Sequence, residues 1–417
     1  MKQRKTDVLI IGAGPAGLAA AVQLKRLGLT DLLVLERDSM AGGMPRFCHH
    51  TGFGILDRHR LKTGPGYAAA WVADAKRRQV ELLTQTTVID WTGPLTCLAT
   101  GPEGLQEIEA RAVLLATGCR ERPRAARLVA GSRSQGIFTT GSLQDFVHHL
   151  NCRVGKRAVI VGAEKVSLSA LMTLAKARCR VAALVTSFPH HQFYGIYRPA
   201  KFALADLLHR APVKTNSTIH QIIGHERVEA VEIKDRLTGE CMSIPCDTVV
   251  FTGDWIPDHE LARRGGVPMD GYTLGPSVDR CLRTGKTGVF AAGNLLRGAE
   301  TADVAAKEGL LVAGSIEAYL RHNDTASPCV AIVPDAAVRW VSPNLASSVD
   351  PSTSFRPVRF SVKDFCRPAL VRIEQAGQVL FEQRLAACVP NTSYAVRDHW
   401  LTKVNLAAGP VRFSVVQ

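Results

Sequence analysis

The stretch Asp7-Val-Leu-Ile-Ile-Gly12-Ala-Gly14-Pro-Ala-Gly17 decides the fold of this chain. The apolar run before Gly12 predicts a buried strand, and the apolar spacing that follows Gly17 predicts a helix that Gly28 ends. Three glycines in the order G-x-G-x-x-G therefore stand at a turn from strand to helix. This order is typical of a loop that lies against a pyrophosphate.

Each glycine of the motif has its own physical reason. Gly12 permits the tight turn, Gly14 lets backbone approach the phosphates, and Gly17 lets the helix lie close to the strand. The phosphates then meet free N–H groups at the start of the helix. Glu36 ends the next strand, 24 residues after Gly12, where its carboxylate can accept hydrogen bonds from ribose hydroxyls. The motif therefore predicts a site for an ADP-containing cofactor, with an inert glycine turn as the alternative.

A second motif repeats this frame in altered form. In Ala158-Val-Ile-Val-Gly162-Ala-Glu164-Lys-Val-Ser167 only the first glycine remains. A carboxylate at Glu164 is expected to occupy the space of a pyrophosphate and to repel it, by several kcal/mol at about 4 Å. The next strand ends at Thr186 without an acid that could bind a ribose. The sequence therefore predicts that ordinary NAD(P)H binding is lost.

Two alternatives remain open for this second motif. Backbone tilt together with Lys165, Arg178 or Arg180 could compensate for Glu164. The pocket could also take another nucleotide or serve as an interface.

Composition limits the class of protein. The chain has 417 residues, 46% hydrophobic and 21% charged, which predicts two or three ordinary globular domains. No apolar run reaches the roughly 20 residues that span a bilayer, and no targeting segment is evident, so we expect a cytoplasmic protein. Eleven cysteines without a C-x-x-C pair argue against a disulfide framework and against a zinc or iron–sulfur site, so no metal is expected.

The chain is strongly basic, with a formal net charge of +14 and a pI near 9.5. A solvated basic surface is the favoured interpretation. An anionic substrate, an acidic partner protein or peripheral contact with a membrane would fit the same charge. No basic run is interleaved with aromatic residues, so nucleic acid is not expected as a partner.

The pattern along the chain predicts an α/β fold with two Rossmann-like dinucleotide-binding domains and a small C-terminal all-β domain. We expect the first domain at 1–120 and 270–322, the second at 121–269 and the β domain at 331–417. In the last of these, the identical pentapeptides Val358–Val362 and Val411–Val415 alternate like strands. Further strands are expected at 369–373, 379–385 and 401–406, which together favour a β-sandwich.

Five stretches resemble the FAD-dependent oxidoreductases that have two dinucleotide-binding domains, the glutathione-reductase-like class. They are Gly12–Gly17 with Glu36, Gly42-Gly43, Ala116-Thr117-Gly118, Phe251-Thr-Gly253-Asp-Trp-Ile-Pro257-Asp and Val289-Phe-Ala-Ala-Gly293-Asn294. This resemblance implies FAD in the first domain, which is interrupted by a second domain of the NAD type.

The resemblance also assigns FAD-binding residues, and it implies a helix near Thr301 whose N-terminus points at the flavin pyrimidine. The candidates for that contact are Thr301, Ala302 and Asp303. Asn294 stands where the family has Asp, which keeps an acceptor oxygen but drops the charge. The expected cofactor residues are Gly12, Gly14, Pro15, Ala16, Gly17, Glu36, Arg37, Gly43, Met44, Arg46, Ala116, Thr117, Gly118, Gly293, Asn294, Thr301 and Ala302.

A narrower likeness is to the flavoprotein subunits of opine oxidases, hydrogen cyanide synthase and dye-linked proline dehydrogenases. It is carried by Gly42-Gly-Met-Pro-Arg46-Phe-Cys48-His-His50-Thr-Gly52-Phe-Gly54 and by Leu61-Lys-Thr-Gly64-Pro65-Gly-Tyr67. Several of those relatives end in a cysteine-rich iron–sulfur segment, which this chain lacks.

Candidate redox residues follow the second strand. Disulfide reductases of this class carry paired cysteines, whereas here Cys48 stands alone, so dithiol chemistry is not expected. Cys48 could form a sulfenic acid if Arg46 or a histidine lowered its pKa, but an unreactive thiol is favoured. His50, with its neighbour His49, could act as a base or orient an anion, against the alternative of a structural loop residue. Arg46, together with Arg58 and Arg60, could bind carboxylate or phosphate.

The leading hypothesis is an FAD-dependent oxidoreductase that acts on a small amine, amino acid or hydroxy compound, or that relays electrons for a partner subunit. Its electrons would pass to a quinone-like carrier or to another protein. One alternative is a self-contained NAD(P)H-dependent FAD reductase. Another is a flavin-bearing scaffold subunit of a larger dehydrogenase complex, in a homo- or hetero-oligomer.

Overall fold

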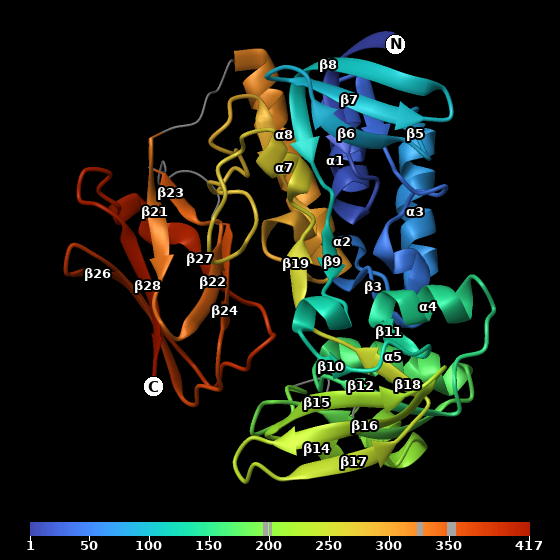
Figure 1. The fold of residues 1–417 in the computed structure, drawn as a ribbon. Helices are drawn as coiled ribbons and strands as arrows, with labels where there is room; N and C mark the ends of the chain where they lie inside the picture. The colour runs from blue at the N-terminus through green and yellow to red at the C-terminus, as the bar shows by residue number, and fades with distance from the viewer. Residues whose placement is uncertain (195–198, 200–201, 323–327, 348–355) are drawn as a thin grey trace. The chain divides into compact units, whose positions relative to one another are not determined.

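The computed structural model describes residues 1–194, 199, 202–322, 328–347 and 356–417 (Figure 1). The chain forms two compact units. Unit 1 contains Met1–Arg46, Thr51–Arg120 and Ile256–Gln417, and unit 2 contains Phe47–His50 and Glu121–Trp255. The predicted α/β fold with two Rossmann-like domains is confirmed.

Unit 1 is built on a mixed sheet in the order β5-β2-β1-β8-β7-β6, with β20 paired to the end of β8. Parallel pairing joins β5, β2, β1, β8 and β20, whereas β7 pairs antiparallel with both β8 and β6. The strands are β1 (Lys2–Ile11), β2 (Leu32–Leu35), β5 (Glu81–Leu83), β6 (Thr87–Trp91), β7 (Thr96–Gly101), β8 (Gly104–Leu115) and β20 (Val289–Ala291).

Helices and short strands complete this part of unit 1. The helices are α1 (Pro15–Arg26), α2 (Ile55–Arg58), α3 (Gly64–Arg77), α7 (Glu260–Arg264) and α8 (Ala302–His322). A small hairpin pairs β3 (Thr51–Phe53) with β4 (Lys62–Thr63). Besides the short excursion at Phe47–His50, the chain passes between the units at β9 (Cys119–Glu121) and β19 (Trp255–Pro257).

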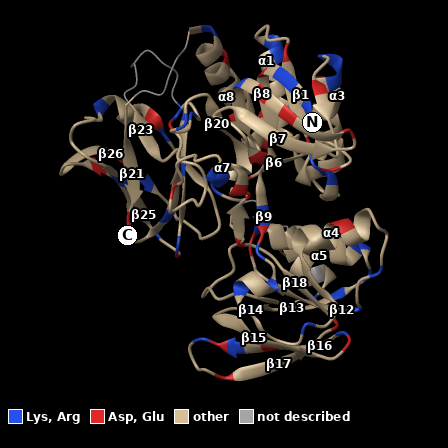
Figure 2. Cartoon of the chain, turned by 45° about the horizontal axis from the view of Figure 1, so that its top comes forward, with Lys and Arg blue, Asp and Glu red and all other residues tan. Residues whose placement is uncertain are grey.

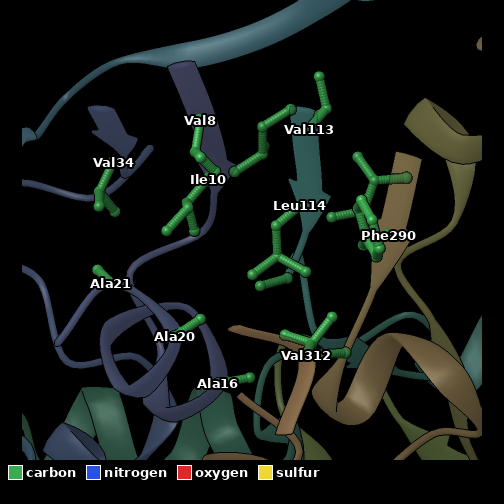
Figure 3. Packing of buried hydrophobic residues seen from close by; sticks show 14 of the residues in the cluster. Val8, Ile10, Ala16, Ala20, Ala21, Val34, Val113, Leu114, Phe290 and Val312 are labelled. Carbon is green, nitrogen blue, oxygen red and sulfur yellow. The ribbon is translucent and has the colours of Figure 1, made fainter. Parts of the chain in front are cut away.

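The core of unit 1 lies between the central strands and the helices α1 and α8. Ile10, Leu114 and Val312 are fully buried in it, together with the alanines of α1 (Figure 3). Complete burial of one such large apolar side chain contributes about 1.5–3 kcal/mol. The two helices approach so closely that a Cβ at Gly309 of α8 would lie 2.1 Å from the Ala16 carbonyl oxygen of α1. This packing places the start of α8 beside the glycine turn.

Unit 2 contains a five-stranded sheet in the order β11-β18-β12-β13-β14, in which every pair is parallel. A second sheet has the order β10-β15-β16-β17. The strands are β10 (Ala130–Gly131), β11 (Ile137–Thr139), β12 (Arg157–Val161), β13 (Arg180–Val185), β14 (Val213–Lys214), β15 (Ser217–Gly224), β16 (Val228–Asp235), β17 (Cys241–Pro245) and β18 (Thr248–Phe251). The helices are α4 (Thr140–His148), α5 (Lys165–Lys176) and a π-helical segment (Phe202–Leu208).

The C-terminal strands form two sheets around one core, as the β-sandwich prediction requires. The first has the order β23-β21-β28-β25-β26 and the second the order β22-β24-β27. The strands are β21 (Cys329–Pro334), β22 (Val338–Ser342), β23 (Leu345–Ser347), β24 (Pro357–Val362), β25 (Ala369–Gln375), β26 (Gln378–Leu385), β27 (Tyr394–Arg397) and β28 (Val411–Val416).

The two identical pentapeptides lie in β24 and β28, one in each sheet. Their phenylalanines, Phe360 and Phe413, meet in the shared core with ring centroids 5.1 Å apart. The expected strand at 401–406 is wrong: Asp398–Lys403 forms a 3₁₀ helix instead. The buried carboxylate of Asp398 accepts hydrogen bonds from the distant Arg280 side chain and from the Arg356 backbone N–H, and these contacts hold the chain in a bend.

Candidate functional site

The first glycine turn leaves an open space in front of α1. Gly12 has φ 107°, and a Cβ there would lie 2.4 Å from the Ala116 carbonyl oxygen. A Cβ at Gly17 would lie 1.9 Å from the Gly12 carbonyl oxygen. Gly14, the N-cap of α1, is different, because a Cβ there would meet nothing within 4 Å. The two outer glycines are thus required by protein packing, while the middle one faces space that a pyrophosphate can fill.

Glu36 is fixed at the end of β2 by two backbone groups. Its carboxylate accepts hydrogen bonds from the Ala13 N–H at 2.9 Å and from the Asp38 N–H at 3.0 Å, and the side chain is buried. Each carboxylate oxygen can accept a further hydrogen bond. The position therefore suits an acceptor for ribose hydroxyls beside the glycine turn.

The segment after β2 packs against the same turn. A Cβ at Gly43 would lie 2.9 Å from the Gly14 Cα, so the backbones touch. Arg46 is buried and forms an ion pair with Asp38. Arg37 is mostly exposed and pairs with Asp258 at 3.1 Å. The predicted role of Arg46 in catalysis stays a prediction, and its position beside Gly43 favours support of the phosphate loop.

The carboxyl ends of β8 and β20 meet at this edge of the sheet. The Ala292 N–H donates to the Leu115 carbonyl oxygen, and Gly293 follows with φ 77°. A Cβ at Gly118 would meet nothing within 4 Å, so this turn also faces open space. Asn294 accepts a hydrogen bond from the Glu300 N–H at 3.2 Å through its side-chain oxygen. In open α/β sheets, ligands bind at this edge.

The helix α8 begins at Ala302, one residue after the expected start at Thr301. Asp303 in its first turn accepts hydrogen bonds from the backbone N–H groups of Gly54 and Leu56, at 2.8 and 2.7 Å. Asp303 is therefore occupied with the loop that carries α2, which leaves Thr301 and Ala302 as the candidates for contact with a flavin. The positive end of a 21-residue helix favours negative charge placed before it.

The residues of unit 1 fit FAD. Its pyrophosphate requires open space and a free helix start, which Gly14, Gly118 and the start of α1 provide. Its ADP ribose requires an acceptor, which the fixed Glu36 carboxylate provides. Met44 lies in a short 3₁₀ helix directly after Gly43.

The structure groups Cys48 and the two histidines after it with unit 2. The Cys48 thiol donates to the Gln144 side-chain oxygen at 3.7 Å, and burial raises its pKa to about 12. Because desolvation is the largest influence on this pKa, the structure favours the unreactive thiol over a sulfenic acid. A thiol with this pKa is neutral and unreactive near pH 7.

The ring of His49 stacks on the ring of His148 of α4, with the ring centroids 4.2 Å apart. The pKa of His148 is lowered to about 4, first by burial and then by neighbouring cations and histidines. The backbone N–H of His50 donates to the Cys48 carbonyl oxygen. These contacts favour a structural role for this loop within unit 2, and a catalytic role for His50 stays a prediction.

The second glycine turn keeps the shape of the first but is partly filled. Gly162 has φ 141°, and Glu164 is the N-cap of α5 in the place that Gly14 has before α1. The Glu164 carboxylate accepts a hydrogen bond from the Thr252 hydroxyl at 3.3 Å. A Cβ at Gly253 would lie 3.5 Å from this carboxylate, whereas the corresponding Gly118 faces open space.

Glu164 is 3% exposed, and burial raises its pKa to about 7. Its side chain makes no capping hydrogen bond to α5. The carboxylate turns back toward the end of β18, so the expectation that it stands in the anion position at the helix start needs correction. The free N–H groups of α5 are not occupied by this side chain.

Two cations, Arg127 and Lys165, act on Glu164 and lower its pKa, and of these the sequence did not single out Arg127. Its guanidinium donates to the carbonyl oxygens of Thr252 and Gly253 at 3.1 and 2.6 Å and lies over the Phe251 ring. Burial lowers the pKa of Arg127, while Glu164 is one of the acids that raise it. The sequence gives no sign that Arg127 lies near Glu164, because the position of Arg127 depends on its hydrogen bonds to the residues that follow β18.

Among the described residues, no group of His, Cys, Asp or Glu could hold a metal ion. Within the same residues, no helix is long and apolar enough to cross a membrane.

Comparison with known proteins gives the family. The family model for pyridine nucleotide-disulphide oxidoreductases matches residues 6–309. The chain is 28% identical to a thioredoxin reductase of Mycolicibacterium smegmatis, over 76% of this chain and 97% of that protein. It is 26% identical to a ferredoxin–NADP reductase of Ignicoccus hospitalis, over 76% of this chain and 98% of that protein. It is 27% identical to the sarcosine oxidase subunit alpha of Rhizobium meliloti, over 78% of this chain and 32% of that subunit.

A solved structure supports the fold alone. The thioredoxin reductase of T. acidophilum superposes with a TM-score of 0.63 at 23% identity, covering 75% of this chain and 98% of that one. The match over residues 6–309 agrees with the intact glycine turn of unit 1 and with the parallel sheet of unit 2. The chain belongs to the pyridine nucleotide-disulphide oxidoreductase family as an FAD-dependent oxidoreductase.

Proposed function

We propose that this chain is a self-contained NAD(P)H-dependent FAD reductase that passes electrons to an acceptor other than a disulfide. The observation that carries the proposal is the second glycine turn. Its five-stranded parallel sheet is complete, and the start of α5 is not capped by the Glu164 side chain. An uncapped helix start beside a glycine turn is a site for the phosphates of a nucleotide.

The relatives support this proposal over the oxidation of an amine, amino acid or hydroxy compound that the sequence favoured. One is a thioredoxin reductase and another a ferredoxin–NADP reductase, and both are covered over nearly their whole length. The acceptor is argued from the cysteines. Cys48 has no cysteine neighbour in C-x-x-C spacing and its thiol is held neutral by burial, so it cannot relay electrons as a dithiol.

The chain's own residues bind and orient in this proposal. The turn at Gly12–Gly17 and Glu36 would hold the ADP half of FAD, and the start of α8 would favour negative charge on the flavin ring. When bound, FAD would supply two-electron redox chemistry between a reduced nicotinamide and the acceptor. The basic charge of the chain suits an acidic carrier protein as that acceptor.

Steady-state assays test the proposal with the FAD-loaded protein. Each NADPH or NADH should reduce two ferricyanide ions and release one proton, while an aromatic disulfide should not be reduced. Turnover of the disulfide would contradict the choice of acceptor. Absence of turnover with every acceptor would contradict the proposal as a whole.

A second candidate function rests on one observation against nucleotide binding. The Glu164 carboxylate fills the space at Gly253 that is open at Gly118. If that space is needed, the chain is a flavoprotein subunit that relays electrons from a partner, or a scaffold, in line with the narrower likeness to opine oxidase and proline dehydrogenase subunits. The similarity to a sarcosine oxidase subunit supports this candidate. Co-purification with a second dehydrogenase subunit, and activity only in that complex, would favour it.

A further inference from the structure

A basic cavity lies in unit 1, away from the glycine turn. Its volume is about 430 Å³. The charged residues that line it are Arg58 on α2, Arg60 and Lys62 on the hairpin, and Asp74 and Arg77 on α3. Basic residues, blue in Figure 2, lie on both units, but here four of them surround one hollow.

Arg58 is held in place before any ligand arrives. Its guanidinium carbon lies 3.9 Å from the centre of the Trp71 ring, and Nη2 donates to Asp74 at 2.8 Å. Its buried Nε has no hydrogen-bond partner among the described residues. A stacked guanidinium is pre-organised, so little further entropy is lost when it binds an oxyanion.

The positive charges around the cavity are not balanced. Among the described residues that line the cavity, Asp74 is the single carboxylate, and it is shared between Arg58 and Arg77. Neither Arg60 nor Lys62 forms an ion pair with any residue in the described part of the chain. The other two residues that line the cavity are the small side chains Ala70 and Ala73 of α3.

We propose that this cavity binds a small ligand through an oxyanion, either a phosphate group or a pair of carboxylates. Arginine forks match the geometry of both groups and form charge-assisted hydrogen bonds with them. The volume lies in the usual range of about 300–1,000 Å³ for small-molecule sites. The lining shares no residue with the turn at Gly12–Gly17, so the site is separate from the place expected for the FAD pyrophosphate. It is also independent of the proposed NAD(P)H reductase activity.

Calorimetric titration of the FAD-loaded full chain tests the proposal, with pyrophosphate and citrate as the two probes. We expect saturable binding of at least one probe. The probe that binds more tightly shows whether the cavity prefers a phosphate group or a pair of carboxylates. In the double variant Arg60→Ala, Lys62→Ala, the Kd should rise about tenfold or more. The affinity should also fall as the ionic strength is raised.

The double variant Lys76→Ala, Arg78→Ala is the matched control. It removes the same amount of charge from the end of α3, at exposed residues outside the cavity. Its Kd should stay within about twofold of the unsubstituted chain. Arg60 and Lys62 have no ion pair to lose, and thermal unfolding checks that the first variant is folded. Equal weakening in both double variants, or no saturable binding of either probe, would overturn the proposal.

Discussion

Glu164 and Gly14 are the N-cap residues of α5 and α1. Glu164 carries a buried carboxylate, whereas the space in front of Gly14 is open. Burial raises the pKa of Glu164 from 4.5 to about 7. The folded chain therefore binds this proton more tightly than the unfolded chain does. The contribution of protonated Glu164 to stability is complete below about pH 4.5 and is lost as the pH rises to about 7.

The substitution Glu164→Gln should therefore stabilise the chain in a pH-dependent way. A shift from 4.5 to about 7 corresponds to about 3 kcal/mol at most. Urea unfolding near pH 8 should show a gain of up to that size, and little gain near pH 5. The exposed Glu240→Gln is the control and should show no such difference. A gain for Glu164→Gln that is the same at both pH values would contradict the assignment.

Glu36 supports a second prediction at the same scale. The substitution Glu36→Ala removes the acceptor of the Ala13 and Asp38 N–H groups and of the expected ribose hydroxyls. Hydrogen bonds to a charged group contribute about 1.5–3 kcal/mol each, so the Kd for FAD should rise about ten- to hundredfold. Titration of the apoprotein with FAD measures it. Glu103→Ala, at an exposed surface pair, should bind FAD like the unsubstituted chain.

At the scale of elements, the contact between α1 and α8 positions both ends of the cofactor site. Gly309→Ala would bring a Cβ to 2.1 Å from the Ala16 carbonyl oxygen and force the helices apart. We expect a loss of about 1–3 kcal/mol in the free energy of unfolding, together with weaker retention of FAD. Thermal unfolding and the flavin content of the purified protein measure both effects.

Gly314 provides the matched control in the same helix. A Cβ at Gly314 would meet nothing within 4 Å, and the position is exposed. Gly314→Ala should therefore raise the stability by up to about 1 kcal/mol through helix propensity alone. If the two substitutions had equal effects, close packing of α8 on α1 would not be the reason for Gly309.

Elements with a strong local signal were predictable from the sequence. The glycine turn between β1 and α1, and the position of Glu36, follow from residue order alone. The 3₁₀ helix at Asp398–Lys403 did not follow, because its bend depends on Arg280, which lies 118 positions earlier. The contact of Arg127 with the end of β18 was missed for the same reason. Long-range polar contacts leave no periodic trace in a sequence.

At the scale of the whole molecule, a buried ion pair joins the C-terminal strands to the rest of unit 1. The Arg280 Nε donates to the Asp398 carboxylate at 2.8 Å, and both side chains are almost fully buried. The Arg356 guanidinium donates to the Arg280 carbonyl oxygen. We therefore expect the C-terminal strands to unfold together with the remainder of unit 1.

Removing one partner of this pair tests the coupling. Asp398→Ala removes the buried carboxylate that pairs with the Arg280 guanidinium and should cost about 3–5 kcal/mol. Calorimetry should show a single unfolding transition of unit 1 that has moved to a lower temperature. Arg372→Ala, at an exposed pair with Glu382, should change the stability by less than about 1 kcal/mol. A separate early transition of the C-terminal strands in the unsubstituted chain would argue against coupling.

Anaerobic titration of the FAD-loaded chain with NADPH and NADH distinguishes a self-contained reductase from a subunit that relays electrons for a partner. We expect one of the two nucleotides to bleach the flavin absorption stoichiometrically. We also expect that nucleotide to bind more tightly below about pH 7, where Glu164 is neutral, and the Glu164→Gln variant to lack this pH dependence. A flavin that stays oxidised with excess of both nucleotides, yet is reduced by dithionite, would show that the chain is not an NAD(P)H-dependent reductase.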